Sequence, residues 1–301
     1  MPFSDAEREN GLRRAWAQYE VDFPEDLCFR ISFCHVFTVV YMKIRVGVLG
    51  HGRNDSSEYD GAHNKKGQDL KEFLEGYNPN KYPNPSATVD MAIFAVEDLD
   101  SFDRESMRKF MSDIKSGKDT DKELRILLIK RGNHPFLGWW ATPGGFVEYK
   151  EDIKTAAYRE LEEETGCTEA MLTEVCVCGD VYRDPRTRVI STLYTGILDA
   201  DEIKYKAGDD AADAHLFTVH VKECENSEKT ETVGGIKKTY KKYLLTLENP
   251  ENGIKLSAGV DSYTYKDKFL EETEYKVVEK DGISADHGAL IMHALDRFTR
   301  I

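Results

Sequence analysis

The segment from Pro143 to Cys167 reads PGGFVEYKEDIKTAAYRELEEETGC, and it carries the most specific pattern in the 301-residue chain. Residues 152–165 predict a helix, because apolar and charged side chains alternate there at helical spacing. Residues three and four apart share one helix face, so Glu160, Glu163 and Glu164 converge. Three carboxylates are therefore expected to point toward one place.

This carboxylate cluster predicts a bound cation. Two carboxylates about 6 Å apart repel each other by roughly 3 kcal/mol at an effective dielectric constant near 20. Oxygen ligands beside a diphosphate suit Mg²⁺ or Mn²⁺, which complete their coordination with water and phosphate oxygens. Gly144 and Gly145 lack a Cβ, so their backbone can approach the same ions or phosphates. The alternative is an acidic, solvated helix face, and the spacing argues against it.

The segment resembles the Nudix box of the Nudix hydrolase family. That box runs Gly, five residues, Glu, seven residues, Arg-Glu, an aliphatic residue, any residue, Glu-Glu, any residue, Gly and an aliphatic residue. The chain matches every glycine and charged position and departs at Cys167, where a small apolar side chain replaces an aliphatic one. The resemblance implies an α/β fold, a Nudix-like α/β/α sandwich with a mixed sheet.

The resemblance also assigns roles to residues. The implied metal ligands are three carboxylates, direct or through water, and one backbone carbonyl: Glu160, Glu163, Glu164 and Gly144. Glu151 and Arg159 would fix the geometry of the box. The family commonly takes the base that activates water from a loop outside the box, and Asp210, or its neighbour Asp209, is the candidate. The alternative for both is an ordinary turn residue.

Segments outside the box look like the ADP-ribose pyrophosphatase branch of the family and the NAD-metabolism regulators related to it. They are 82–90, 129–143, 179–191, 207–217 and 285–287. One departure concerns the substrate: the branch often has Pro about fifteen residues past the last Gly of the box, and this chain has Val181.

Three arginines and one tyrosine are candidate substrate-binding residues. Arg131, Arg183 and Arg186 carry planar guanidinium groups that match phosphate oxygens, although each could equally be a surface arginine paired with an acid. Tyr182 could stack on a nucleobase. His287, in the last helix, is interpreted as an ordinary helix residue.

The composition restricts partners and location. The chain has 41 Lys+Arg against 55 Asp+Glu, a formal charge of −14, which repels nucleic acid and anionic membranes. Apolar runs are shorter than the roughly 18 residues of a membrane span. Six cysteines without CxxC spacing indicate neither a disulfide framework nor zinc, so we expect a cytoplasmic protein. The apolar segment 31–49 and the resemblance predict a homodimer.

The expected organisation is an N-terminal extension of unknown role, residues 1–77, followed by a Nudix hydrolase domain, residues 78–301. Within that domain, residues 224–281 are rich in turn signals and predict inserted β-hairpins. A helix that begins near Ser284 or Asp286 and carries apolar residues at i, i+4 spacing ends the chain.

The sequence thus predicts a metal-dependent hydrolase that cuts the pyrophosphate bond of a nucleoside diphosphate linked to another group. The resemblance favours ADP-ribose, with AMP and ribose 5-phosphate as products. NADH, a nucleotide sugar or an oxidised nucleoside triphosphate are alternatives of the same chemistry. A different class, a transcription regulator with a nucleotide-sensing Nudix domain, is disfavoured because residues 219–301 hold more acidic than basic side chains and lack a basic recognition helix.

Overall fold

The computed structural model describes residues 62–201, 203–206, 211–225 and 228–300. The chain divides into two units, Met1–Tyr77 and Asn78–Ile301, which we describe separately. The described part of the first unit contains helix α2 (Leu70–Glu75). Its N-terminus is closed by a capping box, in which Asp69 accepts from the backbone N–H of Glu72 and the Glu72 side chain accepts from that of Asp69.

A mixed β-sheet forms the centre of the second unit, as the α/β prediction requires. The strands in the described residues are β1 (Ser86–Val96), β2 (Arg125–Arg131), β3 (Trp140–Ala141), β4 (Gly144–Phe146), β5 (Thr173–Cys178), β6 (Val189–Asp199), β7 (Ala211–Glu223), β8 (Lys229–Val233), β9 (Ile236–Asn249), β10 (Ile254–Lys266) and β11 (Glu271–Asp281). Their order is β11-β10-β9-β7-β2-β1-β6-β5, with β3, β4 and β8 pairing beside β2, β1 and β9. The β1–β6 pair is parallel and its neighbours are antiparallel.

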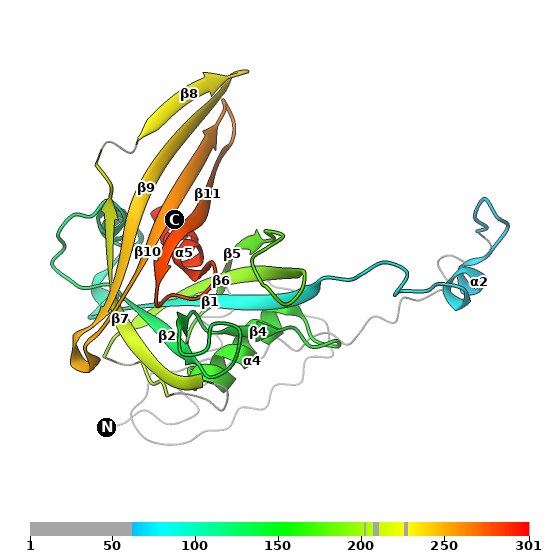
Figure 1. The fold of residues 1–301 in the computed structure, drawn as a ribbon, viewed down its shortest axis with the longest axis horizontal. Coiled ribbons are helices and arrows are strands. Elements are labelled where there is room, and N and C mark those ends of the chain that lie inside the picture. Colours follow the sequence, from blue (N-terminus) through cyan, green and yellow to red (C-terminus); the bar gives the residue numbers. More distant parts are fainter. Residues whose placement is uncertain (1–61, 202, 207–210, 226–227, 301) are drawn as a thin grey trace, which may run out of the picture. The chain divides into compact units, whose positions relative to one another are not determined.

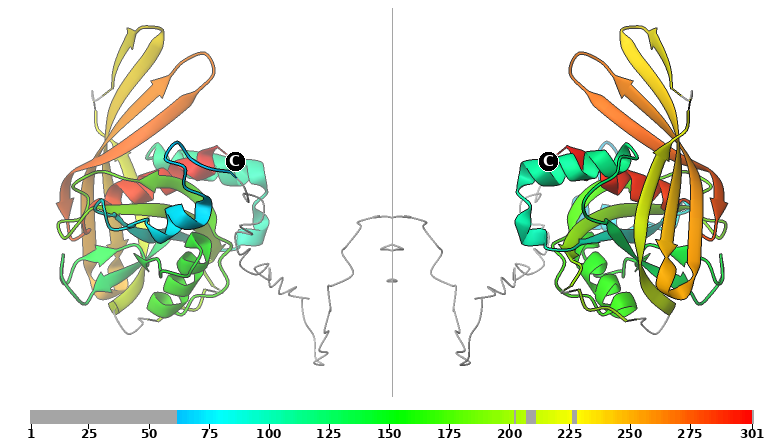
Figure 2. Two further views of the ribbon diagram at one scale, coloured as in Figure 1. Left: turned by 90° about the vertical axis from the view of Figure 1, so that its right-hand side faces the viewer. Right: turned by 90° about the vertical axis from the view of Figure 1, so that its left-hand side faces the viewer.

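Helices cover both faces of this sheet. The helices and short 3-10 turns of the second unit are η2 (Leu99–Ser101), α3 (Arg104–Lys115), α4 (Ile153–Thr165), η3 (Pro250–Asn252) and α5 (His287–Thr299). Helices α3 and α5 lie side by side (Figure 2) and share one core cluster with the sheet. Helix α4 packs in a second cluster with Val89, Met91 and Ile93. Strand β1 is covered from both sides, which explains its nearly continuous apolar sequence.

The region 224–281 forms antiparallel hairpins, as predicted, but these hairpins also continue the central sheet. Strand β9 pairs with β7, and β10 and β11 follow outward (Figure 1). Helix α5 packs against β10 and β11 and also against β5 and β6. The region 224–281 therefore provides part of the sheet surface against which the last helix, α5, packs.

Both helices that the sequence predicts are observed. The box helix expected over 152–165 is α4, and it ends at Gly166 in the left-handed conformation (φ 68°), which glycine adopts without strain. The expected terminal helix is α5. The apolar segment 31–49 lies outside the described residues. Among the described residues, no helix is long and apolar enough to cross a membrane.

Candidate active site

The glycine loop and the box helix are in direct contact. Strand β4 pairs with β1, so Asp90 lies opposite Gly144. A Cβ on Gly144 would lie 2.3 Å from the carbonyl oxygen of Val89, and a Cβ on Gly145 would lie 2.3 Å from the carboxyl carbon of Glu160. Gly144 therefore requires glycine, because its neighbour is backbone, whereas Gly145 leaves space that the Glu160 carboxylate occupies.

Two of the three predicted carboxylates face a cavity and the third lies at its outer side. Glu160 and Glu164 line the cavity, whereas the Glu163 side chain is 59% exposed. Glu164 Oε2 accepts a hydrogen bond from the Gly144 backbone N–H at 2.7 Å. Burial raises the pKa of Glu164 to about 8. Burial also raises the pKa of Glu160, against the opposing effect of Arg159.

Arg159 holds the carboxylates of the box together. Its guanidinium donates to both oxygens of Glu151 at 2.8 and 2.9 Å, and to Glu160 and Glu163 at 2.8 and 2.9 Å. The remaining bond, at 3.0 Å, goes to the carbonyl oxygen of Phe146. These five bonds match the five N–H donors of the side chain. The hydrogen bond from Arg159 lowers the pKa of Glu151, which is therefore a charged anchor.

The box residues fit a divalent cation by their chemistry. Glu160 and Glu164 are oxygen ligands on one side of the glycine loop, and a desolvated carboxylate pair of raised pKa is stabilised by a cation between its members. Within the described residues, no three His, Cys, Asp or Glu side chains converge as a ready metal cluster. Glu160 and Glu163 accept hydrogen bonds from Arg159, and Glu164 accepts one from the Gly144 N–H. These three side chains would have to turn in order to bind a cation together.

Arg131 lies in the same cavity, which has a volume of about 330 Å³. Its Nε donates to the Pro135 carbonyl at 2.8 Å. Among the described residues no carboxylate lies within ion-pair distance of Arg131, unlike Arg159, Arg183 and Arg186. Burial, followed by the charge of Arg186, lowers the pKa of Arg131. The two terminal nitrogens of Arg131 therefore have no acceptor in the described protein.

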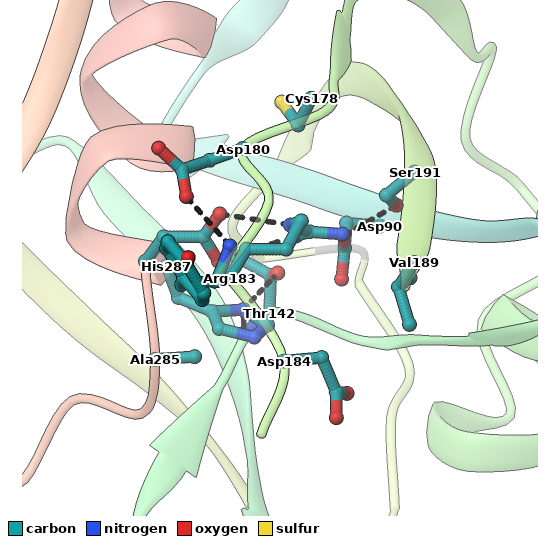
Figure 3. A network of polar contacts seen from close by, with 12 residues as sticks. Asp90, Thr142, Cys178, Asp180, Arg183, Asp184, Val189, Ser191, Ala285 and His287 are labelled. Atoms are coloured by element: carbon teal, nitrogen blue, oxygen red, sulfur yellow. Dashed lines mark hydrogen bonds and ion pairs between the residues drawn. The ribbon is translucent and has the colours of Figure 1, made fainter. Parts of the chain in front are cut away.

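Arg183 is buried in a network of polar contacts (Figure 3). It donates to Asp90 at 3.0 Å and to both oxygens of Asp286 at 2.9 and 3.2 Å. Asp90 also accepts from Ser191 Oγ at 2.6 Å. The Arg183 side chain is only 7% exposed. It therefore joins β1 to the first residues of α5, and its guanidinium is already used by protein carboxylates.

His287 and Thr142 form the second part of this network. The backbone N–H and the Oγ1 of Thr142 lie 3.2 and 2.8 Å from His287 Nδ1. Thr142 precedes the glycine loop by two residues, so the start of α5 is connected to the box as well as to Arg183.

The other predicted substrate residues are placed differently. Arg186 lines the cavity but is held by Asp184 at 2.7 Å, and its guanidinium lies 5.4 Å from the Phe146 ring centroid. Tyr182 is 90% exposed and does not line this cavity. Asp210, the predicted base, lies outside the described residues. Of the predicted set, the structure thus brings the following residues to one cavity: Arg131, Arg183, Arg186, Gly144, Glu160 and Glu164.

Sequence reasoning did not single out Asp90, Thr142, Asp286 and His287 as site residues. Their signal was weak: His287 and Asp286 stood in the Ala285–His287 segment, but His287 was interpreted as an ordinary helix residue. That interpretation was incomplete, because His287 lines the cavity and contacts Thr142. The partners of each contact lie 93 to 145 residues apart, so no local pattern reveals them.

Comparison with known proteins agrees with this geometry. The sequence profile of the NUDIX domain matches residues 118–234, which include the glycine loop, α4 and the segment of Arg183. This chain contains a Nudix domain. The Nudix prediction is thereby confirmed, and the resemblance to the ADP-ribose pyrophosphatase branch is supported by a relative named below.

Two curated relatives match the region around the Nudix box. An ADP-ribose pyrophosphatase of Methanocaldococcus jannaschii is 45% identical over 100 residues, 33% of this chain and 58% of the relative. An ADPR responsive transcriptional repressor, NtrR, of Acinetobacter baylyi is 35% identical over 128 residues, 42% of each chain. The chain thus spans less than two thirds of the length of either relative.

Among solved structures, a MutT/nudix family protein from Enterococcus faecalis is similar to this chain at 25% identity and a TM-score of 0.48, over 82% of this chain and 74% of that one. The NUDIX domain of Shewanella oneidensis NrtR, complexed with ADP ribose, matches at 24% identity and a TM-score of 0.39, over 50% of this chain and 82% of that one.

Proposed function

We propose that this protein hydrolyses the pyrophosphate bond of a nucleoside diphosphate linked to another group, and that ADP-ribose is its substrate, giving AMP and ribose 5-phosphate. One observation carries the proposal. The same cavity is lined by the glycine loop, by the carboxylates of Glu160 and Glu164, and by the guanidinium of Arg131, which has no ion-pair partner among the described residues. Carboxylates suited to a cation and a free guanidinium are the two groups that a diphosphate requires.

Each residue has a defined role in this mechanism. A divalent cation, Mg²⁺ or Mn²⁺, held by Glu160, Glu163, Glu164 and the carbonyl of Gly144, would neutralise the diphosphate and acidify a bound water. Arg131 binds non-bridging phosphate oxygens through its terminal nitrogens. Arg159 and Glu151 hold the box carboxylates in position. Water attacks one phosphorus, the bridging P–O bond breaks, and the second phosphate leaves with that oxygen. Asp210 remains the proposed base.

The choice of ADP-ribose rests on the relatives and on the segments outside the box. The relative at 45% identity is named as an ADP-ribose pyrophosphatase. Val181, where that branch often has Pro, keeps NADH, nucleotide sugars and oxidised nucleoside triphosphates as alternatives of the same chemistry. A cytoplasmic homodimer is part of the proposal, and light scattering at micromolar protein concentration tests the dimer.

The experiment is a substrate panel with product identification. We expect AMP and ribose 5-phosphate from ADP-ribose with Mg²⁺ or Mn²⁺, slower turnover of nucleoside triphosphates, and no turnover in EDTA. Turnover of an oxidised dGTP at an equal or higher rate would reject ADP-ribose as the substrate. Undiminished activity in EDTA would reject the metal mechanism.

A second candidate function, nucleotide-controlled repression of transcription, is favoured by the relative named as an ADPR responsive transcriptional repressor. In the part of the chain that the structure describes, the helix that follows β7 is α5, whose face is buried against the sheet. A buried helix is not a recognition helix. A footprint on DNA next to the chain's own gene, abolished by ADP-ribose, would support the repressor; we expect none at physiological salt.

A further inference from the structure

His287 occupies a fixed orientation and one protonation form. A backbone N–H can only donate, so the Nδ1 that faces Thr142 N at 3.2 Å must accept and carries no proton. The hydroxyl of Thr142, at 2.8 Å, donates to the same atom. Burial lowers the pKa of His287, which agrees with a neutral ring. The proton of the neutral imidazole is therefore on Nε2, and that atom is a hydrogen-bond donor.

The Nε2 donor has no partner within the described part of the protein, and it reaches the cavity. The fully enclosed side-chain atoms without a partner there are Asp261 Oδ1 and Ser284 Oγ. His287 Nε2 is therefore accessible, although the residue as a whole is only 7% exposed. The surface that His287 retains lines the 330 Å³ cavity that also contains Arg131 and Glu164.

The surroundings of His287 favour a hydroxyl group over a phosphate. Asp286 lines the same cavity, and each of its oxygens accepts one bond from Arg183, so each has room for another donor. The carboxylates of Asp90 and Asp286 both pair with the one guanidinium of Arg183, so this side of the cavity has a net charge of one negative. A hydroxyl can accept from an imidazole N–H and donate to a carboxylate, whereas a phosphate would be repelled by that charge.

We propose that His287 is a substrate-contacting residue, whose Nε2–H donates to a hydroxyl of the sugar attached to the diphosphate while Asp286 accepts from that sugar. This inference rests on the proposed function and names the class of substrate: a nucleoside diphosphate whose second phosphate carries a polyhydroxylated group. A nucleoside triphosphate carries no sugar on its terminal phosphate, so it offers no hydroxyl at the position that this wall would recognise. The start of α5, 122 positions after the end of the box helix, thereby contributes to specificity.

The test uses two variants that each keep one face of the imidazole. Asn places its amide at the distance of Nδ1 from the backbone, so His287→Asn can still face Thr142 but loses the Nε2 donor. Gln reaches the position of Nε2, so His287→Gln keeps a donor in the cavity but loses the acceptor for Thr142. The KM for ADP-ribose and the inhibition constant for ADP, which has no second sugar, are measured for wild type and both variants, with circular dichroism melting to follow the fold.

We expect His287→Asn to raise the KM for ADP-ribose about 5- to 10-fold, as the loss of one hydrogen bond predicts, with a much smaller change for ADP. His287→Gln should raise the KM less than His287→Asn does. The opposite order, or an equal loss for both ligands, would show that His287 only anchors Thr142, and would overturn the inference.

A ligand-side control needs no variant. On the wild-type protein, an ADP ester whose terminal sugar is replaced by a methyl group should bind several-fold more weakly than ADP-ribose. Equal binding would overturn the sugar contact even if a His287 variant failed to fold. If the wild type turns over no ADP-ribose, the proposed function fails and the inference fails with it. If the wild type turns over ADP-ribose normally but the His287 variants weaken ADP-ribose and ADP equally, the inference about His287 fails and the proposed function stands.

Discussion

The cavity has two walls that are built in different ways. The box wall comes from one continuous stretch of 21 residues, Gly144 to Glu164, and its central arginine, Arg159, bonds only to residues between 146 and 163. The opposite wall takes Asp90 from β1, Arg183 from the loop between β5 and β6, and Asp286 and His287 from α5. Its contacts span 93 to 145 residues of chain.

The two central arginines show what this difference means. Arg159 lies at the outer side of the box and sets the positions of carboxylates that would bind a cation. Arg183 is more deeply buried, and its two carboxylate partners fix loop and helix relative to the strand. We therefore propose that the box wall carries the chemistry and that the opposite wall recognises the substrate. The predictions below test this division.

The largest effect is expected on the box wall, from Glu164→Gln. Gln keeps an oxygen that can accept from Gly144 N–H but removes the charge that would bind the cation. Turnover should fall by at least about 10²–10³-fold, as for the loss of one strong electrostatic contact in an active site. Steady-state rates with ADP-ribose and Mg²⁺ measure it.

Glu162→Gln is the matched control for this prediction. Glu162 lies on the same helix and is exposed, outside the cavity. Its replacement should leave turnover within about 2-fold of wild type, as for most surface changes. Equal sensitivity of Glu162 and Glu164 would contradict the carboxylate mechanism and the assignment of the box wall.

A smaller effect is expected from Arg131→Ala, which removes the free guanidinium from the cavity. Hydrogen bonds to charged groups contribute about 1.5–3 kcal/mol, so kcat/KM should fall roughly 10- to 150-fold. Arg125→Ala is the control, because Arg125 lies at the other end of β2 and pairs with Glu97 away from the cavity. A similar loss in both variants would mean that the effect comes from strand stability.

Helix α5 carries part of the opposite wall, and the stability of the fold around it is expected to depend on pH through His293 on α5. Burial lowers the pKa of His293 to about 4, below its ordinary value of 6.5. The unfolded chain therefore binds a proton that the folded chain does not, and stability is lost as pH falls from about 6.5 toward 4. Between pH 7 and pH 5 this group alone should cost about 2 kcal/mol of the free energy of unfolding.

Denaturant unfolding of wild type and His293→Phe at several pH values checks this dependence. Phe keeps the edge-on contact with Tyr275, whose ring centroid lies 4.9 Å away, and cannot take up a proton. His287 also has a lowered pKa, but it is present in both proteins and cancels in the difference. An equal loss of stability in both proteins at pH 5 would contradict the prediction.

The smallest effect concerns stability without metal. In EDTA, Glu164→Gln should be slightly more stable than wild type, because it removes a buried carboxylate whose charged form is disfavoured first by burial and then by the neighbouring charge of Glu160 at i, i+4. Glu162→Gln, which leaves both carboxylates intact, should not show the gain. A marked destabilisation by Glu164→Gln would show that the bond from Gly144 needs the full carboxylate charge.

The sequence alone determined the box wall. Helical spacing placed Glu160 and Glu164 on one face and the glycine pair marked the close approach, because these relations lie within a few turns of one segment. The sequence also predicted α5 and the hairpins of residues 224–281, whose apolar periods and turn residues are local signals. Their continuation of the central sheet was not predictable, because pairing of β9 with β7 leaves no local pattern.

Only the tertiary structure decided the opposite wall. The sequence offered Arg131, Arg183 and Arg186 as candidates. They differ because folding places carboxylates beside Arg183 and Arg186 and none, among the described residues, beside Arg131. His287 likewise lies beside Thr142 because α5 packs against β10 and β11, an arrangement that depends on the whole fold. A side chain's availability depends on which distant groups neutralise it, and that depends on how the sheet and helices pack.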